Sequence, residues 1–461
     1  MDHEDFRINS EDEMEVDDNE EVPEDKRKVY IPGVSRPLNE DEEWEFDPEA
    51  YHFFHTFETT KPCLSFDVIL DEDGDNRSTY PLSLFLVGGS QNEEKRKNEL
   101  YVMKLKNLYG FEHEKKGGED DSDDDESSSE SEDEDTQPID GHGDTAAAGA
   151  GKKRKEKPKD AILHSATIDH SGNVNRIKEA RLGVSSICAV WNDVGKVQLW
   201  NLTEAVRTVD QMDGGTQNHK MLKQVPLYTF DHKIEGYGLG WSPLTPGLLA
   251  SGDQKNKIYI HNMGEGGAWK SNATPLTGHN DSVEDLQWSY TEANLLTSAS
   301  VDKSIRLWDV RAKPKDACVC VVENAHDSDV NVISWNPNDP YIVSGGDDGV
   351  LKVWTLRSFQ QKFPVATFKH HKAPITSVEW CPTESATFIA SGEDDQATIW
   401  DLALETESGE AGETVADVPP QLLFVHMGQK EIKEVHWHRQ IPGLAITTSL
   451  TGFNVFRTIS V

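Results

Sequence analysis

The sequence predicts an all-β protein, a seven-bladed β-propeller with an N-terminal helix and disordered acidic segments. A pattern of His, Trp, Asp and Trp recurs about every 46 residues, a period typical of propeller blades. Short runs of alternating apolar residues, such as "SIRLW" and "VLKVW", are separated by Gly, Asp and Asn, which predicts small antiparallel sheets. Two acidic stretches contain too few apolar residues to offset the entropy lost on folding.

The repeat is best preserved in three places. One repeat runs from His279 through Trp288, Asp302 and Trp308, and equivalent repeats begin at His326 and His371. Each such repeat predicts one four-stranded blade.

Three further repeats are less complete. The repeat at 232–263 has Lys255 where the turn Asp is expected and His261 in place of the last Trp. The repeat at 170–202 lacks the turn Asp, and the repeat at 426–458 has Phe456 instead of Trp.

The remaining blade comes from strand-like runs at 64–108 and 162–168. The chain ends one strand short of a complete last blade, so an N-terminal strand is expected to close the ring. Both 29–33 and 64–69 are candidates for this strand.

The predicted organisation has three parts. These are a disordered acidic tail at 1–27, a segment at 28–62 with a helix packed on the propeller, and the propeller at 63–461. A disordered insertion at 112–160 is expected to connect the third and fourth strands of the first blade. The long connections at 203–226 and 403–421 fall at equivalent points, on the face opposite the repeat histidines.

The composition narrows the class of protein. The formal net charge is -38, and the five cysteines follow no metal or pairing spacing, which favours a reducing intracellular compartment. No apolar run approaches the roughly 20 residues needed to cross a bilayer, so a soluble protein without membrane association is expected. No nucleophile–base pair, phosphate loop or metal motif is present in the pattern, so we expect a binding platform rather than an enzyme, with no cofactor.

The repeat residues resemble the WD-repeat family. In that family a loop His, a strand Ser, a turn Asp and a Trp form a hydrogen-bonded chain that stiffens each blade. His279, Ser298, Asp302 and Trp308 match these positions.

A closer resemblance covers the chain from about residue 28 onward. "EGYGLGWSP", "DHSGNVNRI" and "VADVPPQLLFVH" are similar to the retinoblastoma-binding branch of WD-repeat proteins, the histone chaperones. "SVEDLQW", "SGGDDGVLKVW" and "GFNVFRTISV" resemble the glutamate-rich group within that branch. The resemblance implies a nuclear and nucleolar protein, which could shuttle to the cytoplasm, that binds histones and chaperones a basic large-subunit ribosomal protein. Pre-ribosomal particles and an import receptor are further expected partners, and a monomer is expected.

A client groove is predicted near the N-terminus. Residues 47–60 are expected to form a helix with Asp47 as its N-cap and Pro48 in its first turn, because Tyr51, Phe54 and Phe57 recur at helical spacing. The resemblance adds three residues of the acidic "PP" connection to the groove: Asp417, Pro419 and Pro420.

A second candidate surface surrounds the mouth of the central channel on the histidine side. The residue five positions after each repeat His is expected to line it, which selects Asn175, Tyr237, Glu284, Asn331 and Thr376. In the related chaperones, positions matching Glu235, Tyr237, Glu284 and Asn331 receive an extended basic tail. Thr376 and Pro374 depart from that pattern.

The acidic run at 119–135 contains twelve acidic residues and five serines. Its leading acids are Asp120, Asp121, Asp123, Asp124, Asp125 and Glu126. Such a run attracts a basic client over long range and disfavours nucleic acid as a direct ligand, although a solubilising tail has the same composition. An acid three residues on makes Ser122, Ser127, Ser129 and Ser131 candidate phosphorylation sites.

Two short motifs suggest other partners. "KKRK" at 152–155 fits a nuclear-import signal. "WDVR" at 308–311 resembles the adaptor-docking box of cullin-ligase substrate receptors, which would require Arg311 to be exposed. The alternatives to a chaperone are therefore a cullin-RING ligase receptor and a general nuclear scaffold.

Overall fold

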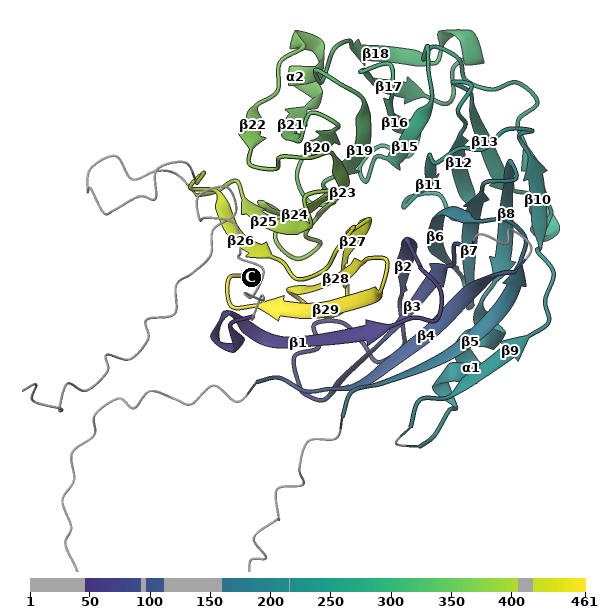
Figure 1. Cartoon of the computed structure of the whole chain (residues 1–461). Helices are drawn as coiled ribbons and strands as arrows, with labels where there is room; N and C mark the ends of the chain where they lie inside the picture. The colour runs from purple at the N-terminus through teal and green to yellow at the C-terminus, as the bar shows by residue number, and fades with distance from the viewer. Residues whose placement is uncertain (1–45, 93–96, 112–159, 215, 405–417) are drawn as a thin grey trace, which may run out of the picture. The chain divides into compact units, whose positions relative to one another are not determined.

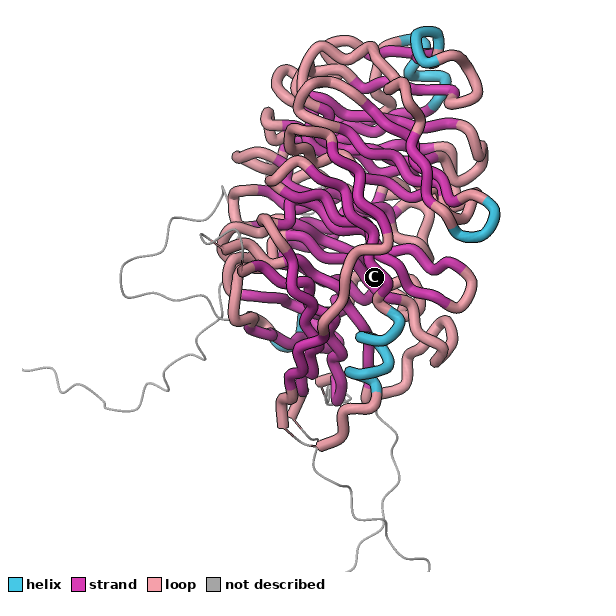
Figure 2. The backbone as a smooth tube through the Cα atoms, turned by 90° about the vertical axis from the view of Figure 1, so that its right-hand side faces the viewer, coloured by secondary structure: helices cyan, strands magenta, loops and turns pink. Residues whose placement is uncertain are grey.

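The computed structural model describes residues 46–92, 97–111, 160–214, 216–404 and 418–461. Within these residues the strands form seven sheets, and all strand pairs but one are antiparallel. All of them belong to one compact unit, residues 45–461. The sheets are arranged in a ring around a central channel (Figure 1), and the view turned by 90° shows their strands stacked side by side (Figure 2). The predicted seven-bladed propeller is confirmed.

We number the blades 1 to 7 along the chain. Blade 1 contains β2 (Ser65–Ile69), β3 (Leu82–Gly89), β4 (Asn98–Leu108), β5 (Ile162–His170) and β9 (His219–Leu222). Blade 2 contains β6 (Val174–Leu182), β7 (Ser185–Asn192), β8 (Lys196–Asn201) and β10 (Tyr228–Asp231). Blade 3 contains β11 (Leu239–Trp241), β12 (Leu248–Gly252), β13 (Ile258–Met263) and β14 (Trp269–Ser271). Blade 4 contains β15 (Val283–Trp288), β16 (Leu295–Ser300), β17 (Ile305–Asp309) and β18 (Cys318–Val322).

The last three blades follow the same order. Blade 5 contains β19 (Val330–Trp335), β20 (Tyr341–Gly346), β21 (Val350–Thr355) and β22 (Ala366–Lys369). Blade 6 contains β23 (Ile375–Trp380), β24 (Thr387–Gly392), β25 (Gln396–Asp401) and β26 (Leu422–His426). Blade 7 contains β27 (Glu434–Trp437), β28 (Leu444–Thr448), β29 (Gly452–Thr458) and β1 (Tyr51–Glu58). The described helical segments are η1 (Pro48–Ala50), α1 (Thr203–Asp210), η2 (Glu265–Gly267), η3 (Pro314–Asp316) and α2 (Leu356–Gln361).

Strand β1 closes the ring, and the predicted N-terminal helix is wrong. Only Pro48–Ala50 is helical, as a single 3₁₀ turn capped by the Asp47 side chain, which accepts a hydrogen bond from the Glu49 amide at 2.9 Å. From Tyr51 the chain pairs antiparallel with β29. The spacing of the aromatic residues is compatible with a helix, but pairing with the unpaired edge of β29 satisfies backbone groups that an isolated helix would leave in water.

The closing strand is therefore neither of the two segments that the sequence suggested. Residues 29–33 lie outside the described part of the chain, and 64–69 contributes β2, the innermost strand of blade 1. The propeller consequently includes residues 51–58, which the predicted boundary at 63 excluded.

The long connections lie where they were expected. The insertion joins β4 to β5, the third and fourth strands of blade 1, and the connections at 203–226 and 403–421 join third to fourth strands of blades 2 and 6. The blade 2 connection also forms α1 and then β9, which adds a fifth strand parallel to β5.

The predicted hydrogen-bonded chain forms in blade 4. The His279 ring lies 2.9 Å from Asp302 Oδ2 and 2.6 Å from Ser298 Oγ, and Trp308 Nε1 donates to the same hydroxyl at 2.8 Å. All four residues are at least largely buried, and the contact with His279 holds the pKa of Asp302 below its usual range although burial opposes this. The loop that carries His279 and the turn that carries Asp302 are thereby bonded to strands β16 and β17.

Other blades carry variants of this chain. In blade 3, Asp253 rather than residue 255 binds His232, at 3.1 Å, so the expected loss of the turn Asp is wrong. In blade 6 the hydroxyl comes from Thr398 on the third strand. In blade 2 no hydroxyl is available, and neither His170 Nε2 nor Trp200 Nε1 has a hydrogen-bond partner.

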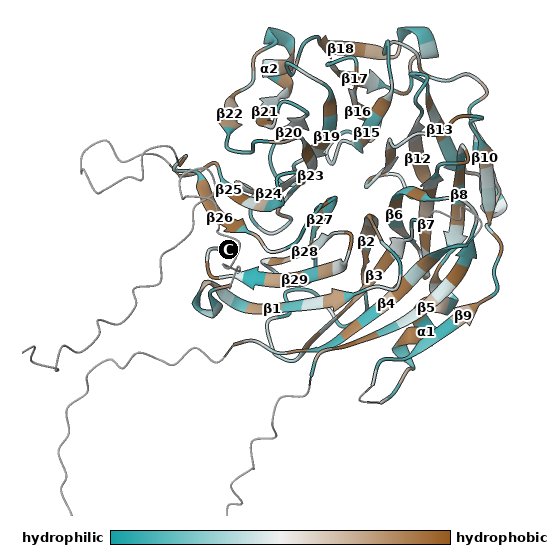
Figure 3. Cartoon of the chain, in the orientation of Figure 1, coloured by the Kyte–Doolittle hydropathy of each residue, from teal (hydrophilic) through white to brown (hydrophobic). Residues whose placement is uncertain are grey.

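The core lies between neighbouring sheets. Hydrophobic residues concentrate on the strands and polar residues on the connections (Figure 3). The innermost Trp of several blades also bonds to the preceding blade: Trp288 Nε1 donates to Gly240 O at 2.9 Å, and Trp380 Nε1 donates to Ser334 O at 3.0 Å. Each sheet is therefore fixed to its neighbour by both packing and directional bonds.

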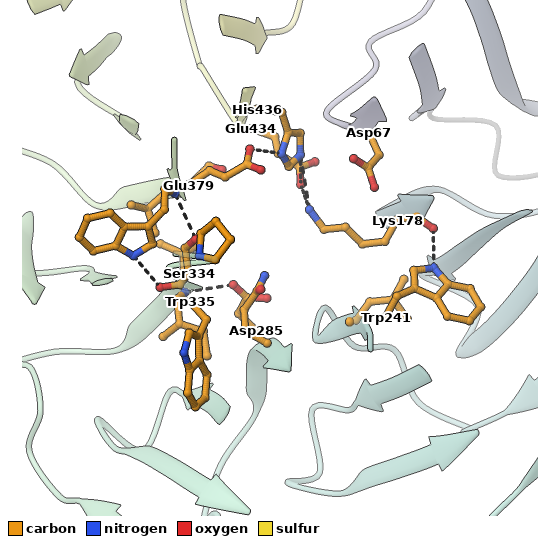
Figure 4. Close-up of a pocket in the computed structure, with 18 of the residues that line it drawn as sticks. Asp67, Lys178, Trp241, Asp285, Ser334, Trp335, Glu379, Glu434 and His436 are labelled. Carbon is orange, nitrogen blue, oxygen red and sulfur yellow. Dashed lines mark hydrogen bonds and ion pairs between the residues drawn. The ribbon is translucent and has the colours of Figure 1, made fainter. Parts of the chain in front are cut away.

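Buried charges join the blades at the centre. Glu434 on β27 accepts from Lys178 Nζ on β6 at 2.8 Å (Figure 4). The same oxygen accepts from Arg176 Nη1 on β6 at 3.3 Å, and the other oxygen accepts from Ser65 Oγ on β2 at 2.7 Å. Burial opposes the charge, but Lys178 and its neighbours hold the pKa of Glu434 well below its usual range.

His436 extends this network. Its ring lies 3.2 Å from Glu434 and 2.8 Å from Glu379, as Figure 4 shows. Burial and Lys178 oppose protonation, yet the two carboxylates raise the pKa of His436 to about 9. The network spans blades 7, 1, 2 and 6, and it lines a channel cavity of about 260 Å³.

The hydrogen-bonded chain predicts a difference between two matched substitutions. Both Trp308→Phe and Trp200→Phe shorten a buried ring, but only Trp308 Nε1 has a partner to lose. We expect Trp308→Phe to lower the free energy of unfolding by about 1–2 kcal/mol more than Trp200→Phe, because the Ser298 hydroxyl loses its donor. Chemical denaturation of the two variants measures this, and equal losses would contradict the role given to the indole.

The buried network predicts a large effect of Glu434→Gln. Arg176, Lys178 and His436 would lose their shared counter-charge, and breaking a buried ion pair costs about 3–5 kcal/mol. The control is Glu72→Gln, which removes the exposed ion pair with Arg181 and should cost less than about 1 kcal/mol. Denaturation midpoints test both, and similar small losses would show that solvent already screens Glu434.

Candidate functional site: the channel mouth and the rim

The predicted channel-mouth residues occupy a recurring backbone irregularity. In blades 2, 4, 5 and 6, the pairing of the first two strands shifts register at one residue. The residues at these bulges are Asn175, Glu284, Asn331 and Thr376. A bulge leaves its residue out of the ladder and redirects the side chain, so each of these four blades has one redirected side chain at the start of its innermost strand, where the sequence predicts the channel mouth.

Several of these side chains form bonds between blades. Asn175 Nδ2 donates to Gly236 O at 3.2 Å, and Asn331 Nδ2 donates to Ile375 O at 3.1 Å and to Asp347 Oδ1 at 2.7 Å. Glu235 Oε1 accepts from Gln254 Nε2 at 3.2 Å. All are half-buried, so the mouth is held in shape without being closed.

Burial disfavours negative charge at the mouth. Burial raises the pKa of Glu284, and nearby Asp329 adds to this, whereas a hydrogen bond from Ser282 and the charge of Arg176 oppose it. Burial also raises the pKa of Tyr237, with Glu235 and Glu284 adding to the shift. Because burial disfavours the charge of Glu284, a further cationic side chain beside it would stabilise the carboxylate.

Blade 6 differs at the mouth, as the sequence indicated. Thr376 Oγ1 is within 2.8 Å of Ser391 Oγ and donates to Ile432 O at 3.0 Å. Its hydroxyl is therefore used inside the fold. The structure brings Glu235, Tyr237 and Glu284 within electrostatic reach of one another, and this sector forms the candidate cation site.

The predicted groove residues on β1 do not share one surface. Tyr51 and Phe57 are buried, at 5% and 7% exposure, in two different core clusters. A helix would have put both on one face with Phe54, but strand alternation and a bulge after Tyr51 separate Phe57 from the other two. Tyr51 and Phe57 are thus core residues, and Phe54 alone remains half-buried.

Phe54 belongs to an aromatic group that we call the rim cluster: Phe46, Phe54, Phe111 and Phe424. The Phe46 ring lies 4.9 Å from Phe54 and 6.1 Å from Phe111, and 44% of Phe46 is exposed. Phe424 on β26 packs against Tyr51 at 5.2 Å. The cluster therefore lies where β1 meets blade 6.

The acidic "PP" connection leads into this region. Pro419 O accepts from the Leu422 amide at 3.0 Å, in the turn that begins β26, and Pro420 is exposed. Asp417 lies outside the described residues, as do the acidic run at 119–135, its four candidate phosphoserines and the basic run at 152–155.

The rim cluster stands beside the attachment points of three acid-rich segments. Phe46 follows residues 1–45, Phe111 precedes 112–159, and Val418 follows 405–417. Phe111 is fixed in place by its amide, which donates to His52 O at 2.8 Å. Two residues of the rim cluster, Phe46 and Phe111, are therefore neighbours in the sequence of acid-rich segments.

The structure also bears on the exposure of Arg311, on metal ligands and on membrane-spanning helices. The Arg311 side chain is 68% exposed, but Asp309 holds its guanidinium through Nε at 2.9 Å and Nη2 at 2.6 Å. Across the described residues, no group of three or more His, Cys, Asp or Glu side chains is arranged to hold a metal ion. No helix in the described part is long and apolar enough to cross a membrane.

Sequence reasoning missed the central network and most of the rim cluster. Arg176, Lys178, Glu379 and Glu434 stand in strands that were identified only by their apolar residues. A usable signal was present, because a charged residue in the innermost strand of a propeller must face either the channel or a partner. Phe46 and Phe111 gave no pattern, since each stands alone beside a polar segment.

Comparison with known proteins agrees with this architecture. A profile of the histone-binding protein RBBP4 and its counterpart in the CAF1 complex matches residues 41–109, which contain β1 to β4. A profile of the "WD domain, G-beta repeat" matches 269–309, 317–355 and 362–401, the regions of the three best preserved repeats.

Similar proteins match almost end to end. Ribosome assembly protein rrb1 of Schizosaccharomyces pombe is 39% identical, over 94% of this chain and 84% of its own length. Protein HEAT STRESS TOLERANT DWD 1 of Arabidopsis thaliana is 39% identical, over 94% and 92%. Glutamate-rich WD repeat-containing protein 1 of Dictyostelium discoideum is 41% identical, over 94% and 85%. At this identity and coverage, the chain belongs to the family of glutamate-rich WD repeat-containing proteins.

Proposed function

We propose that this protein is a noncatalytic chaperone for a basic client, a large-subunit ribosomal protein during ribosome assembly, with overlapping histone binding. We place its activity in the nucleus and nucleolus. The observation that carries the proposal is the acidic sector formed by Glu235, Tyr237 and Glu284, in which burial disfavours the charge of Glu284.

The mouth supports a client with an extended basic segment. A lysine or arginine entering beside Glu284 would neutralise a carboxylate whose charge burial disfavours. The bulged side chains offer amide and carboxylate groups around it, while the bonds of Asn175 and Asn331 keep the opening rigid. A preorganised site of this kind binds with little loss of conformational entropy.

The rim cluster supports a second, apolar contact with the same client. Phe46 and Phe54 present aromatic surface that the blade does not cover, and such residues act as anchors in protein interfaces. The neighbouring acid-rich segments would attract a basic protein from a distance and raise the rate of encounter. The client would therefore be attracted first by the charge of these segments and would then form short-range contacts with the mouth and the rim cluster.

The names of the relatives support the same client class. One relative is named for ribosome assembly, and the profile matching residues 41–109 is named for histone binding. Ribosomal proteins and histones share dense positive charge, which makes one acidic surface suitable for both.

A cullin-RING ligase receptor is the second candidate, because Arg311 is exposed as that function requires. The Arg311 guanidinium already donates two hydrogen bonds to Asp309, which leaves fewer donors for an adaptor. A general scaffold differs from both, since its binding would not depend on the acidic residues.

Deletion of 119–135 tests the long-range step. The segment contains only acidic residues and serines and so contributes no apolar burial, and the melting temperature should therefore stay nearly unchanged. Association with histones H3–H4 and with a basic large-subunit ribosomal protein should slow, and the dependence of the association rate on salt should flatten. Stopped-flow kinetics at two ionic strengths measures both effects.

The control for this deletion is Phe54→Ala in the intact chain, which should accelerate dissociation and leave the salt dependence of association unchanged. Identical association rates and salt slopes with and without 119–135 would limit the run to a solubilising role.

Substitution at the mouth tests the structured contact. Glu235→Gln together with Glu284→Gln should weaken binding of a synthetic Lys- and Arg-rich 12-residue peptide by about tenfold, because two carboxylates facing the cation are lost. The matched control is Glu292→Gln, an exposed acid on the β15–β16 connection at the other end of the strand. Calorimetry compares them, and equal affinity in both variants would remove the mouth from the client site.

A further inference from the structure

The outer edge of blade 1 is open. Strand β9 (His219–Leu222) pairs with β5 in parallel on one side, and among the described residues no strand pairs with its other side. Figure 1 shows β9 as the outermost strand next to β5. An unpaired edge presents a row of backbone donors and acceptors that can bind another extended chain.

The direction of these backbone groups follows from one hydrogen bond. Asn218 O accepts from the Ser165 amide at 2.9 Å, so the backbone of residue 218 faces β5. Backbone groups of successive residues in a strand point to alternate sides. The amides and carbonyls of His219 and Met221 therefore face outward.

The edge continues as an extended apolar ridge. From Met221 to Leu227, exposed and half-buried residues alternate, and the inward residues include Leu222, which packs on the core between blades 1 and 2. The exposed residues include Met221, Val225 and Leu227, at 53%, 78% and 51% exposure. Three apolar side chains repeated every second or fourth residue match the period of an extended partner.

The charge of the edge selects the partner. Lys220 and Lys223 are exposed, and neither forms an ion pair within the described residues. By contrast, nearby Lys104 is paired with Asp210 at 2.7 Å. Lysines on an edge oppose pairing with a second copy of the same edge, because like charges would meet. They favour a segment that carries acids.

A hollow adjoins one end of the ridge. It is lined by Lys61, Lys97, Asp169, His170 and Met221, among others. The thioether of Met221 is a flexible apolar surface suited to varied side chains. Because the other lining residues, which include Glu99 and Ser171, are polar or charged, a partner strand running along β9 would have space there for one polar side chain.

We propose that the β9 edge is a docking site for an extended acidic peptide of a partner protein, which adds to blade 1 as a further strand. Its backbone bonds to the outward groups of His219 and Met221, its acids face Lys220 and Lys223, and its apolar residues cover the ridge. This site is separate from the channel mouth and prefers the opposite charge, so it goes beyond the proposed client binding.

The test uses the full chain and a fluorescein-labelled nine-residue peptide of Thr and Val in which two Glu stand three residues apart, because Lys220 and Lys223 have this spacing and lie on opposite faces of the extended chain. Fluorescence anisotropy should show saturable binding, and Lys220→Glu together with Lys223→Glu should weaken it about tenfold. The same double variant should gain affinity for the same peptide with both Glu replaced by Lys. Because both lysines are exposed, an unchanged melting temperature verifies that the variant is folded.

Backbone pairing is tested separately from charge. An acidic peptide N-methylated at the residues whose amides face β9 cannot donate its hydrogen bonds and should lose binding, while the same peptide N-methylated at the intervening residues, whose amides face away from β9, should retain most of it. Equal binding of the two methylated peptides, no response to the charge reversal, or a concentration-dependent doubling of mass in light scattering would each overturn the proposal.

Discussion

Closure of the ring between its last and first blades is the constraint on which the other features depend. Strand β1 supplies the fourth strand of blade 7 from the far end of the chain, and it pairs with β29 over its whole length. At the centre, Glu434 of the same blade binds Ser65 of blade 1 and Lys178 of blade 2. The ring is therefore closed at two places. The β1–β29 backbone pairing closes it at the rim, and the buried Glu434 interactions close it at the channel. Buried ion pairs contribute modestly to net stability but strongly penalise arrangements that separate them, so this network favours one order of blades.

A closed ring permits irregularity elsewhere. Each first-strand bulge gives up backbone pairing at the mouth, and the cost is tolerated because both neighbouring blades hold the strand, for example through Trp288 and Trp380. The same repeat that places a structural His in the loop places a variable residue five positions later. Blades thus share a scaffold and differ at the mouth, from Glu284 in blade 4 to Thr376 in blade 6. Recognition can vary by blade without a change in fold.

The sequence predicted the features that repeat and missed those that occur once. The His–Ser–Asp–Trp chain and the four-strand blade recur at a fixed period, so each copy supports the others. Strand β1 has no repeat partner, and its aromatic residues fit both a helix and a strand; only the free edge of β29, far along the chain, decides between them. Asp253 takes the expected turn role from a position two residues early, which spacing alone could not reveal. The Glu434 network depends on strands from four blades, and no local pattern carries that information.

The positions of charge explain how one propeller could handle partners of both signs. Two residues of the rim cluster, Phe46 and Phe111, adjoin acid-rich segments in the sequence, whereas Lys220 and Lys223 lie on blade 1 along an edge made by the connection between β8 and β10. At physiological ionic strength, exposed charges separated by more than about 8 Å interact weakly, so such surfaces can act independently. On the proposals made above, a basic client at the mouth and rim would leave the β9 edge uncovered, and an acidic strand at that edge would not compete for the same carboxylates. Binding at the two places would then be set by local geometry, with the rigid, closed ring holding each surface in position.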